Sequence, residues 1–286
     1  MPALSGRFAA SVTWTKSWTP TRRANGSGMR VPENRNDWLT AAAVGVLAMC
    51  VVTFDHEALG HGGVCVLLNG HIRVLTSSIF RCGVRSAWID PAGPAANLLM
   101  GTLALAGLRL VPERLLTARL LLIVITAFSY FWEAGYLIRA MQRRDGDLYY
   151  FAQFLFGHVS TWQRLVASGV GLALYILTAR LTSDAFLKLW PQVRVARGVA
   201  RTVWISATAG AAAAALAYAG PGWSDFRDAV LETGAASFPL LFIPLTRPQV
   251  EERRSSALLA RSSITIVVAA VIYAVFVASL GRGIAS

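Results

Sequence analysis

The sequence FDHEALGHGG, residues 54–63, follows directly after an apolar run at residues 41–52. It places the imidazoles of His56 and His61 and the carboxylates of Asp55 and Glu57 at the end of a segment suited to a lipid bilayer. Ionisable side chains are costly to bury in lipid, so in membrane segments they usually serve a function. The stretch therefore predicts both a membrane protein and the position of its functional site.

The composition also favours a membrane protein. Of the 286 residues, 55% are hydrophobic and 15% are charged, and the mean hydropathy is +0.51, which is too apolar for a soluble domain of this length. A net charge of +12 would suggest nucleic acid as the partner of a soluble protein. Here Lys and Arg lie mostly between apolar runs and at their ends, where they meet anionic headgroups. We therefore expect membrane lipids as partners and no nucleic acid.

Several apolar runs approach the roughly 20 residues that cross a bilayer as a helix. The predicted fold is an all-α, polytopic membrane helix bundle of about six transmembrane helices, in a bacterial inner (plasma) membrane. A polar, basic tail at residues 1–37 precedes a membrane-embedded domain at residues 38–286. Within this domain, residues 38–160 hold the candidate site and residues 161–286 add further helices. The predicted spans are residues 38–68, 94–111, 115–141, 163–181, 202–219 and 262–280.

The segments between the spans predict smaller elements. Residues 71–82 are short, β-branched and partly alternating, which indicates a small β-hairpin dipping toward the site. Residues 184–201 indicate a basic connector broken by Pro191, residues 225–232 a short polar helix, and residues 238–245 a re-entrant or interfacial segment. The small residues Gly210–Ala215 predict that the fifth span packs inside the bundle.

Cysteine usage and charge give weaker indications. The three cysteines indicate no disulfide framework, and Cys65 is expected to be a buried apolar residue rather than a soft metal ligand. With the N-terminus in the cytoplasm, 15 Lys and Arg fall on the inner side of the membrane and 12 on the outer side. The basic tail itself favours an inside N-terminus.

Two histidines with a glutamate directly after the first are the arrangement that zinc hydrolases use, because neutral imidazoles suit zinc and the glutamate deprotonates water. On a regular helix, a separation of five residues places His56 and His61 about 140° apart, against about 40° for four. Both bind one ion only if the helix is widened by one residue, a distortion that Gly60 makes less costly. On a regular helix, Glu57 and His61 would share a face instead, and Glu57 would be a ligand rather than a base.

A catalytic zinc site needs a third protein ligand and an open position for water. We favour Asp147, and Asp145 next, because the Asp145-Gly146-Asp147 turn lies at the membrane boundary. The alternative is that Asp147 caps the following helix. Glu133, inside the third span, is expected to orient a ligand from outside the coordination sphere or to pair with Arg139. The remaining candidate ligands are Asp55, Asp90, His71 and His158.

These motifs resemble the site-2 protease family of intramembrane zinc metalloproteases. The resemblance rests on residues 56–62 at the end of a membrane helix, on Ala92-Gly93-Pro94-Ala95-Ala96-Asn97-Leu98 opening the next, and on Asp145-Gly146 further on. It implies zinc held by His56, His61 and an aspartate, Glu57 as general base, and Asn97 close to the substrate. The family motif is His-Glu-x-x-His, one residue shorter than here, and its helix runs from outside to inside. The longer His-Glu-x-x-Gly-His form resembles the motif of dipeptidyl peptidase III.

The function we expect is a zinc metalloprotease that cuts a membrane protein or peptide within or beside the bilayer. Residues 71–80 would offer a strand edge to the unwound substrate. One alternative is a catalytically inactive relative that acts as a membrane scaffold or regulator. Another is a transporter or haem protein that uses His56, Glu57 and Glu133 as a proton or cofactor site.

Overall fold

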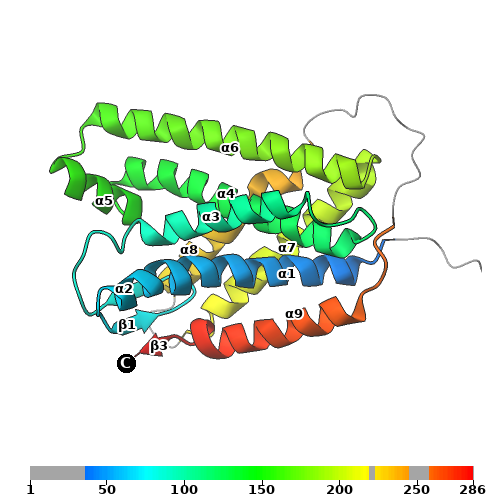
Figure 1. Ribbon diagram of the computed structural model, residues 1–286, viewed down its shortest axis with the longest axis horizontal. Coiled ribbons are helices and arrows are strands. Elements are labelled where there is room, and N and C mark those ends of the chain that lie inside the picture. Colours follow the sequence, from blue (N-terminus) through cyan, green and yellow to red (C-terminus); the bar gives the residue numbers. More distant parts are fainter. Residues whose placement is uncertain (1–35, 219–222, 245–257, 286) are drawn as a thin grey trace, which may run out of the picture. The chain divides into compact units, whose positions relative to one another are not determined.

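The apolar segment that ends in the histidine motif forms one continuous helix. The computed structural model describes residues 36–218, 223–244 and 258–285, so that the predicted tail lies outside the described residues except for its last two. Helix α1 (Trp38–Phe54) continues into the π-helix η1 (Asp55–Gly62) and then into α2 (Gly63–Leu67). The Asp37 side chain caps α1 by accepting a hydrogen bond from the Thr40 N–H. Because α1 packs against α4, α7 and α9, most of its residues are buried (Figure 1).

The other helices follow in short steps along the chain. Helix α3 packs on η1 and α4, and α4 packs on α6, so these helices form a continuous bundle with α1. The remaining helical elements, in chain order, are α3 (Ala92–Gly107), α4 (Leu116–Arg143), α5 (Asp147–Phe156), α6 (Thr161–Leu189), α7 (Val193–Ala215), α8 (Trp223–Ala229), η2 (Val230–Ala235), η3 (Phe238–Leu241), α9 (Ser263–Phe276) and η4 (Val277–Gly281).

The predicted hairpin is present and belongs to a small antiparallel sheet. Strand β1 (Ile72–Leu75) pairs with β2 (Phe80–Cys82), with Leu75 opposite Phe80. A third strand that was not predicted, β3 (Ile284–Ala285), pairs with the other edge of β1 to give the order β2-β1-β3. A two-residue strand carries no periodic signal, so only its contact with β1 reveals it.

Four helical segments in the described part of the chain are long and apolar enough to cross a membrane: residues 38–67, 116–143, 161–189 and 263–281. The other two predicted spans correspond to α3, which has only 16 residues, and to α7, whose first turns carry three arginines. The total of six spans therefore stays a prediction. Helices α6 and α9 expose a series of large apolar side chains, as lipid-facing helices do.

The prediction of a connector at residues 184–201 is wrong. Helix α6 continues to Leu189 and α7 begins at Val193, so the break around Pro191 covers only residues 190–192. Lys and Arg favour a helix almost as strongly as Leu does. The basic segment is amphipathic, because its buried residues, Ala196, Val199, Ala200 and Val203, recur at intervals of three and four. The small residues of α7 are buried against the bundle, as predicted.

The elements have two distinct ends, which we call the motif end and the far end. The motif end gathers η1, the sheet, the start of α3 and the turn after α4, because Asp147 lies beside His61 and β3 pairs with β1. The far end gathers the starts of α1 and α9, where the Leu259 N–H donates to the Asn36 side chain and the Ser262 N–H to Thr40 Oγ1. Each long helix runs between these ends (Figure 1).

Candidate metal centre

The π-helix brings the two histidines of the motif together. In a π-helix the backbone hydrogen bonds join residues five apart, so side chains at that spacing lie one turn above each other. His56 Nε2 and His61 Nε2 are 3.3 Å apart, and both side chains are buried. The local widening that a shared ion requires is therefore present over Asp55–Gly62.

The orientation of His56 is fixed from behind by α3 and α4. Its Nδ1 lies 3.1 Å from Glu133 Oε1, to which Asn97 Nδ2 also donates, over 2.7 Å. For Nε2 to present a lone pair to a metal, Nδ1 must carry the proton and donate it to Glu133, an arrangement common behind metal-binding histidines. The Trp132 ring stacks on the imidazole at 4.7 Å with an angle of 8° between the planes. The imidazole of His56 is thus held both in its plane and on its face.

His61 is oriented in the same way by different elements. Its Nδ1 lies 2.7 Å from the carbonyl oxygen of Ile89, which accepts the Nδ1 proton, and its ring stacks on Phe80 of β2 at 5.6 Å. The Nε2 atoms of both histidines, which face each other, therefore remain available to bind a metal ion.

Asp147 supplies the third possible ligand. Its Oδ2 lies 3.4 Å from His61 Nε2, and His56, His61 and Asp147 together form a group whose ligand atoms lie within 4.8 Å of one another. Tyr136 fixes the aspartate twice, because its hydroxyl donates to Asp147 Oδ2 over 3.0 Å and accepts from the Asp147 N–H over 2.9 Å. The alternative role as a helix cap does not hold, because Gly146 is the N-cap of α5 and no side chain caps it.

Two of the three separations between the ligand atoms fit a tetrahedral ion. With bond lengths of about 2.0–2.2 Å to imidazole nitrogen and carboxylate oxygen, the ligands of a tetrahedral zinc site lie about 3.3–3.5 Å apart. The distance of 3.3 Å between the two Nε2 atoms and that of 3.4 Å between His61 Nε2 and Asp147 Oδ2 match this edge. Gly93 provides the space, because a Cβ at that position would lie 2.6 Å from His56 Nε2 and closer still to His61 Nε2. The three residues could therefore hold a metal ion.

Gly60 lies within the widened stretch and also permits a close contact with α3. A Cβ on Gly60 would lie 2.6 Å from Gly93 Cα and 2.8 Å from the Ala92 carbonyl oxygen. The backbone of η1 thus lies directly on the first turn of α3, an approach that only glycine permits. This contact carries Gly93 to the face of the two imidazoles.

The other predicted site residues lie in different places. Asp55 is buried beside His56, and Asp90 and Asp145 line the cavity at the site, where Asp145 accepts a hydrogen bond from the Tyr150 hydroxyl over 2.6 Å. Asn97 is fully buried and contacts His56 and Glu133, which places it to support the first histidine, while its predicted closeness to a substrate stays a prediction. His71 and His158 are exposed and lie outside the candidate metal group.

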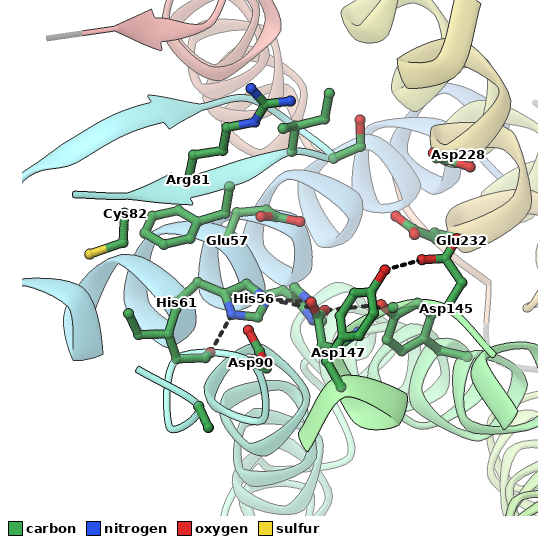
Figure 2. Close-up of a pocket in the computed structure, with 18 of the residues that line it drawn as sticks. His56, Glu57, His61, Arg81, Cys82, Asp90, Asp145, Asp147, Asp228 and Glu232 are labelled. Carbon is green, nitrogen blue, oxygen red and sulfur yellow. Dashed lines mark hydrogen bonds and ion pairs between the residues drawn. The ribbon is translucent and has the colours of Figure 1, made fainter. Parts of the chain in front are cut away.

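A cavity of about 870 Å³ opens beside the three possible ligands. Glu57, which is buried, lines it together with β2, the turn after α4 and residues of α8 and η2. Figure 2 shows Glu57, Asp90 and Asp147 around the two imidazoles, each from a different element. The cavity therefore gives a ligand access to the ion site from the motif end.

The C-terminal half contributes an ion pair that sequence reasoning missed. Arg139 of α4 donates to Glu232 over 2.9 Å and lies 3.7 Å from Asp228, while its guanidinium lies 5.0 Å from the centre of the Tyr136 ring. The predicted pairing of Arg139 with Glu133 is therefore wrong, because Glu133 points to His56. Since residues 139 and 232 lie far apart in the sequence, only the fold relates them.

Burial dominates the acidity of the carboxyl groups that surround the cavity. Burial raises the pKa of Glu232 to about 8, against the attraction of Arg139. Burial, helped by the charge of Asp147, raises the pKa of Asp90 to about 6. Burial also acts to raise the pKa of Asp147, but the hydrogen bond and charge of His61 outweigh it and hold that pKa below its usual range.

Cys65 and Cys82 form a disulfide, although the three cysteines had indicated no disulfide framework. The bond joins α2, which contains Cys65, to β2, which contains Cys82. Cys65 is buried, as predicted, but it is covalently paired, and Cys50 is the one free cysteine. With only three cysteines in the sequence, and a separation of 17 positions between these two, their spacing did not indicate that they would pair.

Comparisons of the chain with protein-family models, with curated proteins and with solved structures give no match. The function is therefore argued from the residues and their geometry.

Tyr136→Phe tests how the third ligand is held. The variant keeps the ring but removes the hydroxyl that both donates to and accepts from Asp147. We expect the affinity for zinc to fall about 10- to 100-fold, the usual effect of losing a group that supports a metal ligand. Zinc titration against a competing chelator measures it, with Tyr130→Phe as the matched control on the same helix. An unchanged affinity would show that Asp147 is positioned without Tyr136.

Proposed function

We propose that this chain is an intramembrane zinc metalloprotease of a bacterial plasma membrane, which hydrolyses a peptide bond of a membrane-associated substrate. The observation that carries the proposal is the convergence of His56 Nε2, His61 Nε2 and Asp147 Oδ2 beside an open cavity. Two nitrogens and one carboxylate oxygen with an accessible fourth side are the donor set of catalytic zinc sites. Structural zinc sites, in contrast, are closed by four protein ligands.

A zinc ion bound there would supply a Lewis acid that activates water and polarises a carbonyl group. Glu57 follows His56 directly, is buried, and lines the same cavity, which supports its role as the base that accepts the proton of the attacking water. Glu133 and the Ile89 carbonyl hold the two imidazoles in the tautomer that leaves Nε2 unprotonated.

The exposed edge of β2 supports a peptide as the substrate. In the order β2-β1-β3 of the described strands, β2 has β1 on one side only, and Phe80, Arg81 and Cys82 line the cavity. An extended peptide can add to such an edge through its backbone hydrogen bonds. A helical substrate must unwind first, because a helix in lipid keeps its amides paired internally.

Zinc content and chelation test the proposal. The purified chain is expected to hold about one zinc ion and to cleave a membrane-protein substrate, since three ligands and one open position define a single catalytic site. His61→Ala is expected to lose both the zinc and the cleavage, whereas His158→Ala, which removes an exposed histidine outside the metal group, keeps both. A chelator should abolish cleavage, and added zinc should restore it.

The alternatives give different results in the same preparation. A catalytically inactive scaffold would bind zinc without cleaving any substrate presented to it. A haem protein would show a strong visible absorption band, which zinc lacks. Wild-type protein that binds no zinc after reconstitution with the ion would contradict the proposal directly.

A further inference from the structure

We infer that the cavity opens on the oxidising, extracytoplasmic side of the membrane, so that this chain acts on peptide segments exposed on that face. The choice of substrate rests on the proposed protease function. The orientation of the chain does not, because it follows from a disulfide and from the distribution of charge.

The first observation is the position of the cysteine pair. Cys65 and Cys82 lie at the motif end, beside the cavity that Cys82 lines, and they are bonded to each other. Cys50 is buried within α1, inside the span, and remains free. Disulfides form and persist in oxidising compartments and are rare where the cytosol keeps thiols reduced. The motif end therefore faces away from the cytoplasm.

The second observation is the distribution of Lys and Arg, which is independent of the first. The sequence that precedes α1, residues 1–37, holds six Lys and Arg, and α1 begins at the far end. The 18 Lys and Arg of the described residues divide evenly, nine nearer the far end of their helices and nine nearer the motif end, so the excess comes from this basic leading sequence. Positive residues accumulate on the cytoplasmic side of membrane proteins.

The disulfide and the basic sequence before α1 therefore indicate the same orientation. In this orientation, α1 runs from the cytoplasm outward and carries the histidine motif at its outer end. This is the reverse of the outside-to-inside direction of the motif helix in the family that the motif resembles. The substrates then present their scissile segment outside the cell membrane, next to the lipid surface. There β2 and arginines such as Arg81 and Arg85 line the cavity.

Two single cysteine substitutions test the orientation. His158→Cys places a thiol in the exposed turn between α5 and α6 at the motif end, and Glu113→Cys places one in the exposed turn between α3 and α4 at the far end. A membrane-impermeant maleimide added to intact spheroplasts is expected to label His158→Cys, and to label Glu113→Cys only after lysis. Each variant is also labelled in denaturant, where two labels per chain, against one at Cys50 in the wild type, show that the new thiol is present.

The wild-type chain supplies the second readout. In denaturant without reductant it should react with maleimide at Cys50 alone, and after reduction at all three cysteines. Labelling of Glu113→Cys in intact spheroplasts, failure to label His158→Cys there, or free thiols at Cys65 and Cys82 would each overturn the inference. Reversed labelling of a chain that still binds zinc and cleaves its substrate would move the substrate to the cytoplasm but spare the proposed function. Labelling of His158→Cys from outside in a chain that holds no zinc would support the orientation but contradict the proposed function.

Discussion

Glu57→Gln is expected to lower the rate of peptide hydrolysis by about 10²- to 10⁴-fold, the usual contribution of a general base, while the zinc content stays that of the wild type. Gln has nearly the same shape as Glu but cannot accept a proton from water. Glu57 is buried and lines the cavity, while the metal group formed by His56, His61 and Asp147 does not include it. The variant therefore separates metal binding from proton transfer.

Cleavage of one peptide substrate by the wild type, Glu57→Gln and the exposed far-end control Glu113→Gln measures the effect, with elemental analysis of each preparation. Full cleavage by Glu57→Gln would show that Glu57 is not the general base and that another group accepts the proton of the attacking water. Loss of zinc in Glu57→Gln would mean that Glu57 is a ligand, which is the role it would have on a regular helix.

The histidine spacing shows how far sequence reasoning reaches at this site. A separation of five positions between His56 and His61 requires a widened helix if both bind one ion, and the π-helix η1 is such a widening. The sequence alone could not decide between this and a regular helix, because the cost of the distortion depends on what packs against it. That partner is the backbone of α3 at Gly93, which lies on Gly60.

Of the α4 residues that support the site, only the charged one could be predicted from the sequence. Glu133 was predicted as a support for a ligand because a carboxylate inside a span is costly without a partner. Tyr136 and Trp132, on the same helix, carry no such signal, since aromatic side chains are ordinary in a membrane helix. Their roles appear only when α4 is placed against η1 and the turn that carries Asp147.

The fold was predicted best where a segment is long and uniformly apolar. The first predicted span agrees with the continuous helix α1 to α2 to within a few residues. The third agrees equally well with α4, and the last with α9 and η4 together. The basic start of α7 was missed because charge was taken to end a helix, whereas one face of that segment is buried. Strand β3 and the Cys65–Cys82 bond both depend on contacts between distant segments, which a single sequence does not contain.

Gly93→Ala is expected to abolish stoichiometric zinc binding, and with it hydrolysis. A Cβ at this position would lie 2.6 Å from His56 Nε2 and closer still to His61 Nε2, whereas zinc needs about 2.0–2.1 Å to each nitrogen. The methyl group and the ion would therefore compete for one volume. Relief would require α3 to move away from η1, which would break the close packing of Gly60 on the α3 backbone.

Gly63→Ala is the matched control, because a Cβ there meets no atom within 4 Å and the residue lies in the same helical stretch. Alanine favours a helix over glycine by up to about 1 kcal/mol, so this variant should keep its zinc and unfold at the same or a higher temperature. Circular dichroism in detergent shows whether Gly93→Ala still has the helical content of the wild type. A helical Gly93→Ala protein that binds zinc as tightly as the wild type would mean that the ion does not lie between the two Nε2 atoms, and the metal centre would have to be placed elsewhere in the cavity.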